Sequence, residues 1–208
     1  MLAILEKPEL LRRAVPLSVA CYEKMAELGL VDERTELLRG VIFEKMSKSP
    51  LHYFLVDLLT ERLKASLPAG QIVRTEAPLA LSDSSPEPDL CVVPGPRSLY
   101  SARHPDSARL VIEVAISSEA LDREKASIYA EAGVEEYWMV LPQRRIIERF
   151  SQPENGIYAR HEVTEAEVTV VSLMFPEFSV NLDELLKSAL VRNPARSGVL
   201  SGKLVRHP

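Results

Sequence analysis

Two acidic residues lie within apolar segments of this chain, where a folded protein seldom places a charge. Asp89 directly precedes the apolar run 90–93, and Glu113 interrupts the aliphatic segment 110–116. Both segments are typical of buried strands, in which an ionised carboxylate is costly unless a cation or a metal ion compensates it. The two acids together therefore predict a metal site.

A lysine is expected to point toward the same layer. The segment after Glu113 is predicted to be a helix that begins at Ser117 and Ser118 and ends at Gly133. The helical period predicts an inward face made of Leu121, Lys125, Ile128, Tyr129 and Ala132. An inward lysine is uncommon without an acidic partner, so Lys125 is the third charged group predicted to face the acids.

Two acids and a lysine are suited to the hydrolysis of a phosphodiester. A hard cation such as Mg²⁺ prefers carboxylate oxygens, and two acids at the ends of adjacent strands can hold it against a phosphate. The ammonium of Lys125 could neutralise charge that develops at phosphorus. With a lowered pKa, it could instead assist deprotonation of the attacking water.

The remaining pattern predicts a central sheet with covering helices. Helix starts are marked by caps, as at Ser49 and Pro50, and ends by glycines, as at Gly70. The expected elements are a helix at 17–28, a strand or bent hairpin arm at 36–46, a helix at 49–70, one or two strands at 71–81, strands that begin at Asp89 and contain Glu113, a helix at 117–133, strands at 137–141, 146–150, 157–161 and 168–173, and a helix at 181–186.

Length and composition indicate one ordinary domain. The 208 residues are 46% hydrophobic and 26% charged, which predicts a single domain over 1–187 followed by a loosely ordered basic tail over 188–208. No run of eighteen apolar residues occurs, and the first residues do not resemble the apolar core of a signal peptide. We therefore expect a cytoplasmic protein without membrane association.

The net charge of −5 gives no general attraction to nucleic acid, so any such binding must be local. The segment 188–208 carries +4 and the rest of the chain −9. A loose extension is the favoured interpretation of this segment, and a basic arm is the alternative. Cys21 and Cys91 lack the spacing of zinc ligands, and we expect two reduced core thiols.

The segments 87–90, 111–115, 122–125 and 129–138 resemble the bacterial Uma-type family of restriction-endonuclease-like nucleases, within the PD-(D/E)XK superfamily. The resemblance extends over roughly residues 17–187. It implies an α/β (α+β) fold with a mixed central sheet flanked by helices, to which this chain adds a C-terminal antiparallel β region. It also implies Mg²⁺ or Mn²⁺ as the cofactor, Asp89 and Glu113 as its ligands, DNA as the substrate, and a possible homodimer.

The chain departs from the superfamily pattern at one position. The usual lysine lies two residues after the second acid, where this chain has Ala115, and by resemblance Lys125 on the following helix takes its role. The family often has a histidine in the first turn of the long helix, so His52 is a further catalytic candidate. A surface or capping histidine is the alternative at that position.

Each candidate also has a structural interpretation. Asp89 alone is typical of a strand-entry turn, Glu113 could pair with Arg109 or Arg123, and Lys125 could extend along an apolar face into water. Six more residues have such an interpretation. Glu36 and Glu44 are favoured as exposed strand acids over an added ligand, Asp122 with Arg123 as a local helix-start pair, and Tyr129 with Trp138 as packing residues.

The sequence thus favours a Mg²⁺-dependent nuclease. In this hypothesis Asp89 and Glu113 bind the cation and Lys125 stabilises the transition state. One alternative is a catalytically silent nuclease fold that binds DNA or a protein partner. Another is an oligomeric scaffold in which the same side chains form only a structural ion network.

Overall fold

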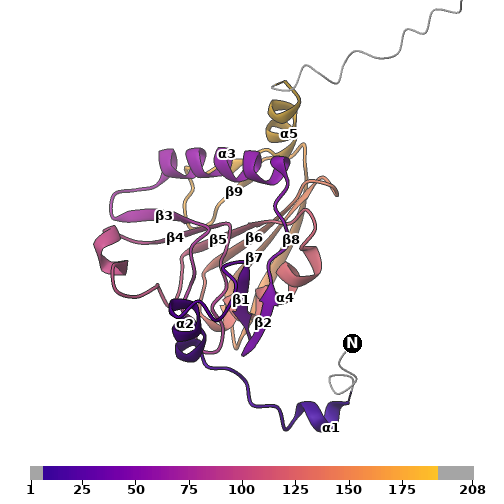
Figure 1. Ribbon diagram of the computed structural model, residues 1–208. Helices are drawn as coiled ribbons and strands as arrows, with labels where there is room; N and C mark the ends of the chain where they lie inside the picture. The colour runs from indigo at the N-terminus through magenta and orange to yellow at the C-terminus, as the bar shows by residue number, and fades with distance from the viewer. Residues whose placement is uncertain (1–6, 192–208) are drawn as a thin grey trace, which may run out of the picture.

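The computed structural model describes residues 7–191, and its centre is a six-stranded mixed sheet (Figure 1). The strands, in their order across the sheet, are β3 (Gln71–Thr75), β4 (Leu90–Pro94), β5 (Leu110–Val114), β6 (Glu136–Leu141), β7 (Ile146–Glu154) and β8 (Ile157–Glu165). Only β5 and β6 pair in parallel; the other neighbours are antiparallel. The predicted mixed sheet with an antiparallel region toward the C-terminus is confirmed.

Helices and two short strand pairs surround this sheet. The helices are α1 (Pro8–Leu11), α2 (Val19–Glu27), α3 (Pro50–Ser66), α4 (Glu119–Glu131) and α5 (Leu182–Val191), with a 3₁₀ turn η2 (Arg97–Tyr100). The strand pairs are β1 (Thr35–Leu38) with β2 (Val41–Glu44), and β9 (Val170–Val171) with β10 (Ser179–Val180). Among the residues that the structure describes, no helix is both long and apolar enough to span a membrane.

The two faces of the sheet carry separate apolar layers. One layer packs against α3 and α5 and the other against α4. On β5, Leu110 and Ile112 belong to the α3 layer and Val111 to the α4 layer. Because side chains alternate along a strand, Glu113 must face α4. The sheet therefore directs this acid toward the helix that carries Lys125.

Helices α3 and α4 begin at the residues that the capping signals in the sequence predict. The Ser49 hydroxyl accepts a hydrogen bond from the His52 backbone N–H at 3.2 Å, and Pro50 is the first residue of α3. This helix ends at Ser66, earlier than expected, and Gly70 lies in the following turn. The predicted start of α4 after Ser118 is confirmed, so the positions of the site residues on both helices follow from the sequence.

The β1–β2 hairpin is tied to the body of the protein through its turn. Gly40 has a φ of +74°, and a Cβ there would lie 2.3 Å from the Cβ of Pro16, so glycine is required. The Arg39 guanidinium pairs with Glu131 at the end of α4, and the Arg39 backbone N–H donates to Ser84 at 2.9 Å. These contacts hold β1 over the α4 face of the sheet.

Some expectations outside the centre differ from the structure. Cys91 is buried as predicted, but Cys21 is exposed on α2, so the prediction of two core thiols is wrong for it. The β structure expected over 71–81 ends at Thr75, because the chain turns away at Glu76, whose φ is +48°. Helix α5 runs to Val191, and the rest of the predicted basic tail lies outside the described residues.

Candidate active site

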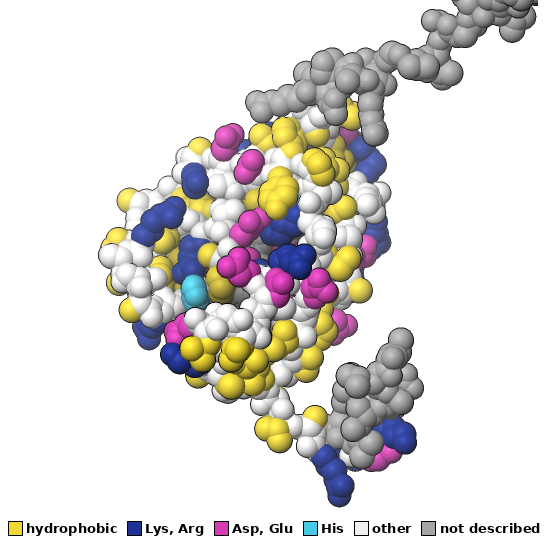
Figure 2. All heavy atoms as spheres, in the orientation of Figure 1, with side chains coloured by type: hydrophobic (Ala, Val, Ile, Leu, Met, Phe, Trp, Pro, Cys, Tyr) yellow, Lys and Arg dark blue, Asp and Glu magenta, His cyan; other side chains and the backbone are white. Residues whose placement is uncertain are grey.

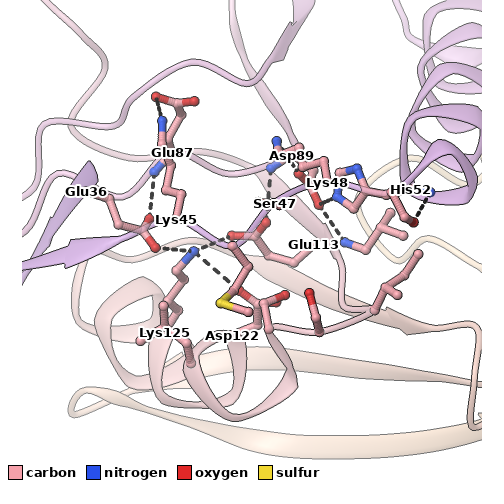
Figure 3. A pocket seen from close by; sticks show the side chains of 17 residues that line it. Glu36, Lys45, Ser47, Lys48, His52, Glu87, Asp89, Glu113, Asp122 and Lys125 are labelled. Carbon is pink, nitrogen blue, oxygen red and sulfur yellow. Dashed lines mark hydrogen bonds and ion pairs between the residues drawn. The ribbon is translucent and has the colours of Figure 1, made fainter. Parts of the chain in front are cut away.

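A cavity of about 220 Å³ contains all four site residues predicted from the sequence (Figure 3). Asp89 and Glu113 come from the adjacent strand ends of β4 and β5, His52 from the first turn of α3, and Lys125 from the middle of α4. The loop between β2 and α3 closes one side and contributes Lys48. Each of the four predicted side chains is less than a tenth exposed.

Asp89 and Glu113 are brought together by the pairing of their strands. Leu90 lies opposite Ile112, so the preceding Asp89 meets the following Glu113 across the β4–β5 ladder. The Asp89 backbone N–H donates to Glu113 Oε2 at 3.1 Å, and the Val114 N–H donates to Asp89 Oδ2 at 2.8 Å. The backbone therefore orients both carboxylates toward the cavity.

Asp89 also contacts two cation-forming side chains. His52 Nε2 lies 3.0 Å from Asp89 Oδ2, and Lys48 Nζ lies 3.0 Å from Oδ1. Burial raises the pKa of Asp89, but the bond to His52 and the charge of Lys48 outweigh it and hold the pKa below its ordinary value. Asp89 is therefore an ionised carboxylate, as a ligand for a cation must be.

Lys125 is surrounded by acids. Its Nζ lies 3.0 Å from Glu36, 3.2 Å from Glu113 and 3.3 Å from Asp122. Burial lowers the pKa of Lys125, but the three carboxylates outweigh it and raise the pKa above that of an ordinary lysine. Lys125 is thus an ammonium, which contradicts the sequence-based alternative of a lysine with a lowered pKa that deprotonates water.

One ammonium cannot balance three carboxylates. Burial raises the pKa of Glu113 to about 8; Lys125 opposes this rise, whereas the neighbouring acids add to it. Burial raises the pKa of Asp122 as well, again against the effect of Lys125. The Tyr129 hydroxyl donates to Glu113 Oε1 at 3.0 Å, so this buried residue is a polar partner of the site as well as a packing residue.

Several structural interpretations from the sequence are wrong. Glu36, favoured as exposed, is 2% exposed and bound to Lys125, whereas Glu44 is exposed as expected. Asp122 pairs with Lys125 and not with Arg123, which binds Glu119 on α4 and Glu148 on β7.

The expected arginine partners of Glu113 are also elsewhere. Arg109 binds Glu135, and Arg123 is directed away from the cavity. Lys125 does not extend into water, because it is 4% exposed. Trp138 packs in the buried α3 layer of the sheet, as the packing interpretation predicts.

Sequence reasoning missed Lys48 and Glu76. Lys48 Nζ bridges Glu76 Oε1 at 2.8 Å and Asp89 Oδ1 at 3.0 Å. No pattern in the sequence relates Lys48 to Glu76, because both residues lie on loops that come together only in the folded protein. Asp122 was within reach of sequence reasoning, since it precedes Lys125 by one helical turn and shares its face.

The donor set fits a hard divalent cation. The cavity is lined by five acids and three lysines, a formal charge of −2 with neutral histidine. Carboxylate oxygens are the ligands that Mg²⁺ and Mn²⁺ prefer. Ligand atoms of His52, Glu76 and Asp89 also lie within 4.8 Å of one another, which gives Asp89 a second set of possible co-ligands beside Glu113.

Comparisons with known proteins identify a matching family and a similar fold. The model of the Uma2 family, described as "Putative restriction endonuclease", matches residues 22–183. No curated protein matches the sequence. Among solved structures, a crystal structure of a "putative nuclease belonging to DUF820" from Anabaena variabilis matches with a TM-score of 0.67 and 16% identity. The match covers 83% of this chain and 98% of that chain, and at this identity it supports the fold alone.

Proposed function

The chain belongs to the Uma2 family of restriction-endonuclease-like proteins, and from this premise we propose that it is a metal-dependent endonuclease that hydrolyses DNA phosphodiester bonds. One observation carries the proposal: Asp89, Glu113 and Lys125 converge from three separate elements on one cavity. With every carboxyl group ionised, the lining has a formal charge of −2, which a divalent cation would neutralise.

Asp89 and Glu113 would hold Mg²⁺ or Mn²⁺. When bound, such a cation polarises the phosphodiester and makes water a stronger nucleophile near neutral pH. His52 keeps Asp89 in place through its bond to Oδ2. Lys125, as an ammonium beside Glu113, supplies a fixed positive charge for the developing negative charge on a phosphate oxygen. The deep burial of these groups strengthens their electrostatic effect on a bound phosphate.

Cleavage of plasmid DNA in the presence and absence of metal tests this function directly. We expect the purified protein to nick or linearise supercoiled plasmid in Mg²⁺ or Mn²⁺. Chelation by EDTA should stop the reaction and renewed metal should restore it, because the cavity has excess negative charge without the cation. Intact plasmid after prolonged incubation with either metal, by a folded protein that binds Mn²⁺, would contradict the nuclease proposal.

Replacement of Lys48 by methionine is expected to tighten metal binding. The ammonium of Lys48 lies 3.0 Å from Asp89 Oδ1 and repels a cation that binds this oxygen. Loss of a unit charge at this distance near the protein surface should lower the dissociation constant for Mn²⁺ by about threefold to tenfold. Titration followed by electron paramagnetic resonance of free Mn²⁺ measures this change. Lys64→Met, an exposed change on α3, is the matched control and should leave the affinity unchanged. If Lys48→Met binds Mn²⁺ as tightly as the wild type or more weakly, Lys48 does not compete with the metal ion for Asp89.

A further inference from the structure

A hollow of about 250 Å³ lies at the β3 edge of the sheet. Its lining residues are Ile72, Arg74, Thr75, Ala77, Arg97 and Tyr100. The only charged side chains in this lining are the two arginines. In Figure 2, dark blue side chains gather on the side of the molecule where Figure 1 places β3 and the turn that follows β4.

The arginines around this hollow differ from most others in the protein. Of the fourteen arginines in residues 7–191, nine lie within 4.0 Å of a carboxylate. Three of the remaining five are Arg74, Arg97 and Arg103, and Arg103 lines the two neighbouring hollows together with Tyr100. Guanidinium groups that lack carboxylate partners are therefore concentrated here.

Neutral partners orient the Arg74 guanidinium without neutralising it. Its carbon lies 5.3 Å from the centre of the Tyr100 ring, a cation–π distance. One of its nitrogens donates to His104 Nδ1 at 3.0 Å and to the Pro78 carbonyl at 3.4 Å. Arg97 makes only a long contact of 3.5 Å with the Val73 carbonyl. Both side chains therefore retain N–H donors and a full positive charge for a ligand.

This hollow adjoins the candidate active site. Thr75 and Ala77 in its lining flank Glu76, whose backbone N–H donates to the Asp89 carbonyl at 3.1 Å. The Glu76 carboxylate belongs to the group of ligand atoms that includes those of His52 and Asp89. A chain of phosphates that reaches the acids could thus continue along β3 to the arginines.

We propose that Arg74 and Arg97 bind a backbone phosphate of the nucleic acid whose scissile bond enters the active site. The inference rests on the proposed function and adds the surface on which the substrate lies. Guanidinium groups match phosphate oxygens in geometry and charge, and contacts to the backbone carry no sequence information. The two arginines supply a local attraction to nucleic acid that the net charge of −5 does not give.

Fluorescence anisotropy with a labelled DNA duplex lacking terminal phosphates tests the surface. The full chain is used in EDTA, so that no cleavage occurs. Arg74→Gln and Arg97→Gln should each weaken binding about threefold to thirtyfold and reduce the slope of log affinity against log salt by about one. Arg97 is exposed, so its replacement is not expected to disturb the fold. Arg160→Gln on β8 removes the same charge at the opposite edge of the sheet and should bind as the wild type does.

The outcomes separate this surface from the catalytic proposal. The proposed binding surface is wrong if Arg74→Gln and Arg97→Gln are both folded and bind the duplex as tightly as the wild type does. It is also wrong if the wild type does not bind the duplex. Either result would stand even if plasmid is cleaved in Mg²⁺. Arginine-dependent binding without any cleavage would support the surface while the catalytic proposal fails. Titration with inorganic phosphate is a further arm: if both variants lose phosphate binding but keep duplex affinity, the hollow is a site for free anions and the nucleic-acid assignment is wrong.

Discussion

Replacement of Asp89 by asparagine is expected to lower the rate of plasmid cleavage by about 10³-fold or more. The amide retains the shape of the side chain and can still accept the Val114 N–H, which donates to Asp89 Oδ2 at 2.8 Å. It lacks the negative charge that holds a divalent cation and that faces His52 and Lys48. The loss should therefore appear in metal binding and in the cleavage rate, with the fold preserved.

Single-turnover cleavage and Mn²⁺ titration measure the two effects on the same preparations. Asp57→Asn is the matched control, because Asp57 is exposed on α3 and lines no part of the cavity. Thermal unfolding checks that the Asp89→Asn variant is folded. If this folded variant cleaves at more than about a tenth of the wild-type rate, Asp89 does not hold the essential cation. If the wild type binds DNA equally with and without metal and never cleaves it, the silent nuclease fold is the correct alternative.

The central part of this site could be predicted from the sequence because its signals are local. Asp89 is conspicuous because it directly precedes an apolar strand, and Glu113 because it interrupts one. The strand period alone places Glu113 on one face of the sheet. Lys125 follows from the 3.6-residue period of α4. In the structure, Asp89, Glu113 and Lys125 line one cavity, as the sequence predicts.

The outer part of the site depends on contacts that no local period encodes. Glu36 lies on a hairpin with alternating polar residues, a pattern equally typical of a solvent-exposed strand. It becomes buried only because the hairpin folds over the α4 face, where Arg39 binds Glu131 at the end of α4. Lys48 and Glu76 come from separate loops that meet at Asp89. The pairing of long side chains from separate loops depends on the tertiary structure, so the charge balance of the site could not be predicted from the sequence.

Replacement of Lys125 by methionine is expected to cost about 3 to 5 kcal/mol in the free energy of unfolding. The ammonium is 4% exposed and is the common partner of Glu36, Glu113 and Asp122. Its loss leaves three buried acids without their cation, and they must take up protons or draw in water. Urea denaturation at neutral pH measures the change. A loss below about 1 kcal/mol would mean that the acids are balanced in another way.

Replacement of Glu113 by glutamine should have a much smaller effect on stability. Because burial raises the pKa of Glu113 to about 8, its native form at neutral pH is mostly protonated, and an uncharged amide resembles that form. A carboxyl group with a raised pKa contributes stability below its ordinary pKa and loses it as the pH rises through its native value. Stability of the wild type should therefore fall between about pH 4.5 and 8, and Glu113→Gln should flatten that fall. Glu124→Gln, an exposed change on α4, should keep the wild-type profile.

The Glu113→Gln variant also distinguishes a metal centre from a structural ion network. If Glu113 is a ligand, Mg²⁺ must raise the melting temperature of the wild type, because binding to the native state alone stabilises it. The rise should be lost in Glu113→Gln, which lacks the charged ligand, and kept in Glu124→Gln. A pure ion network predicts no effect of Mg²⁺ on any of the three proteins.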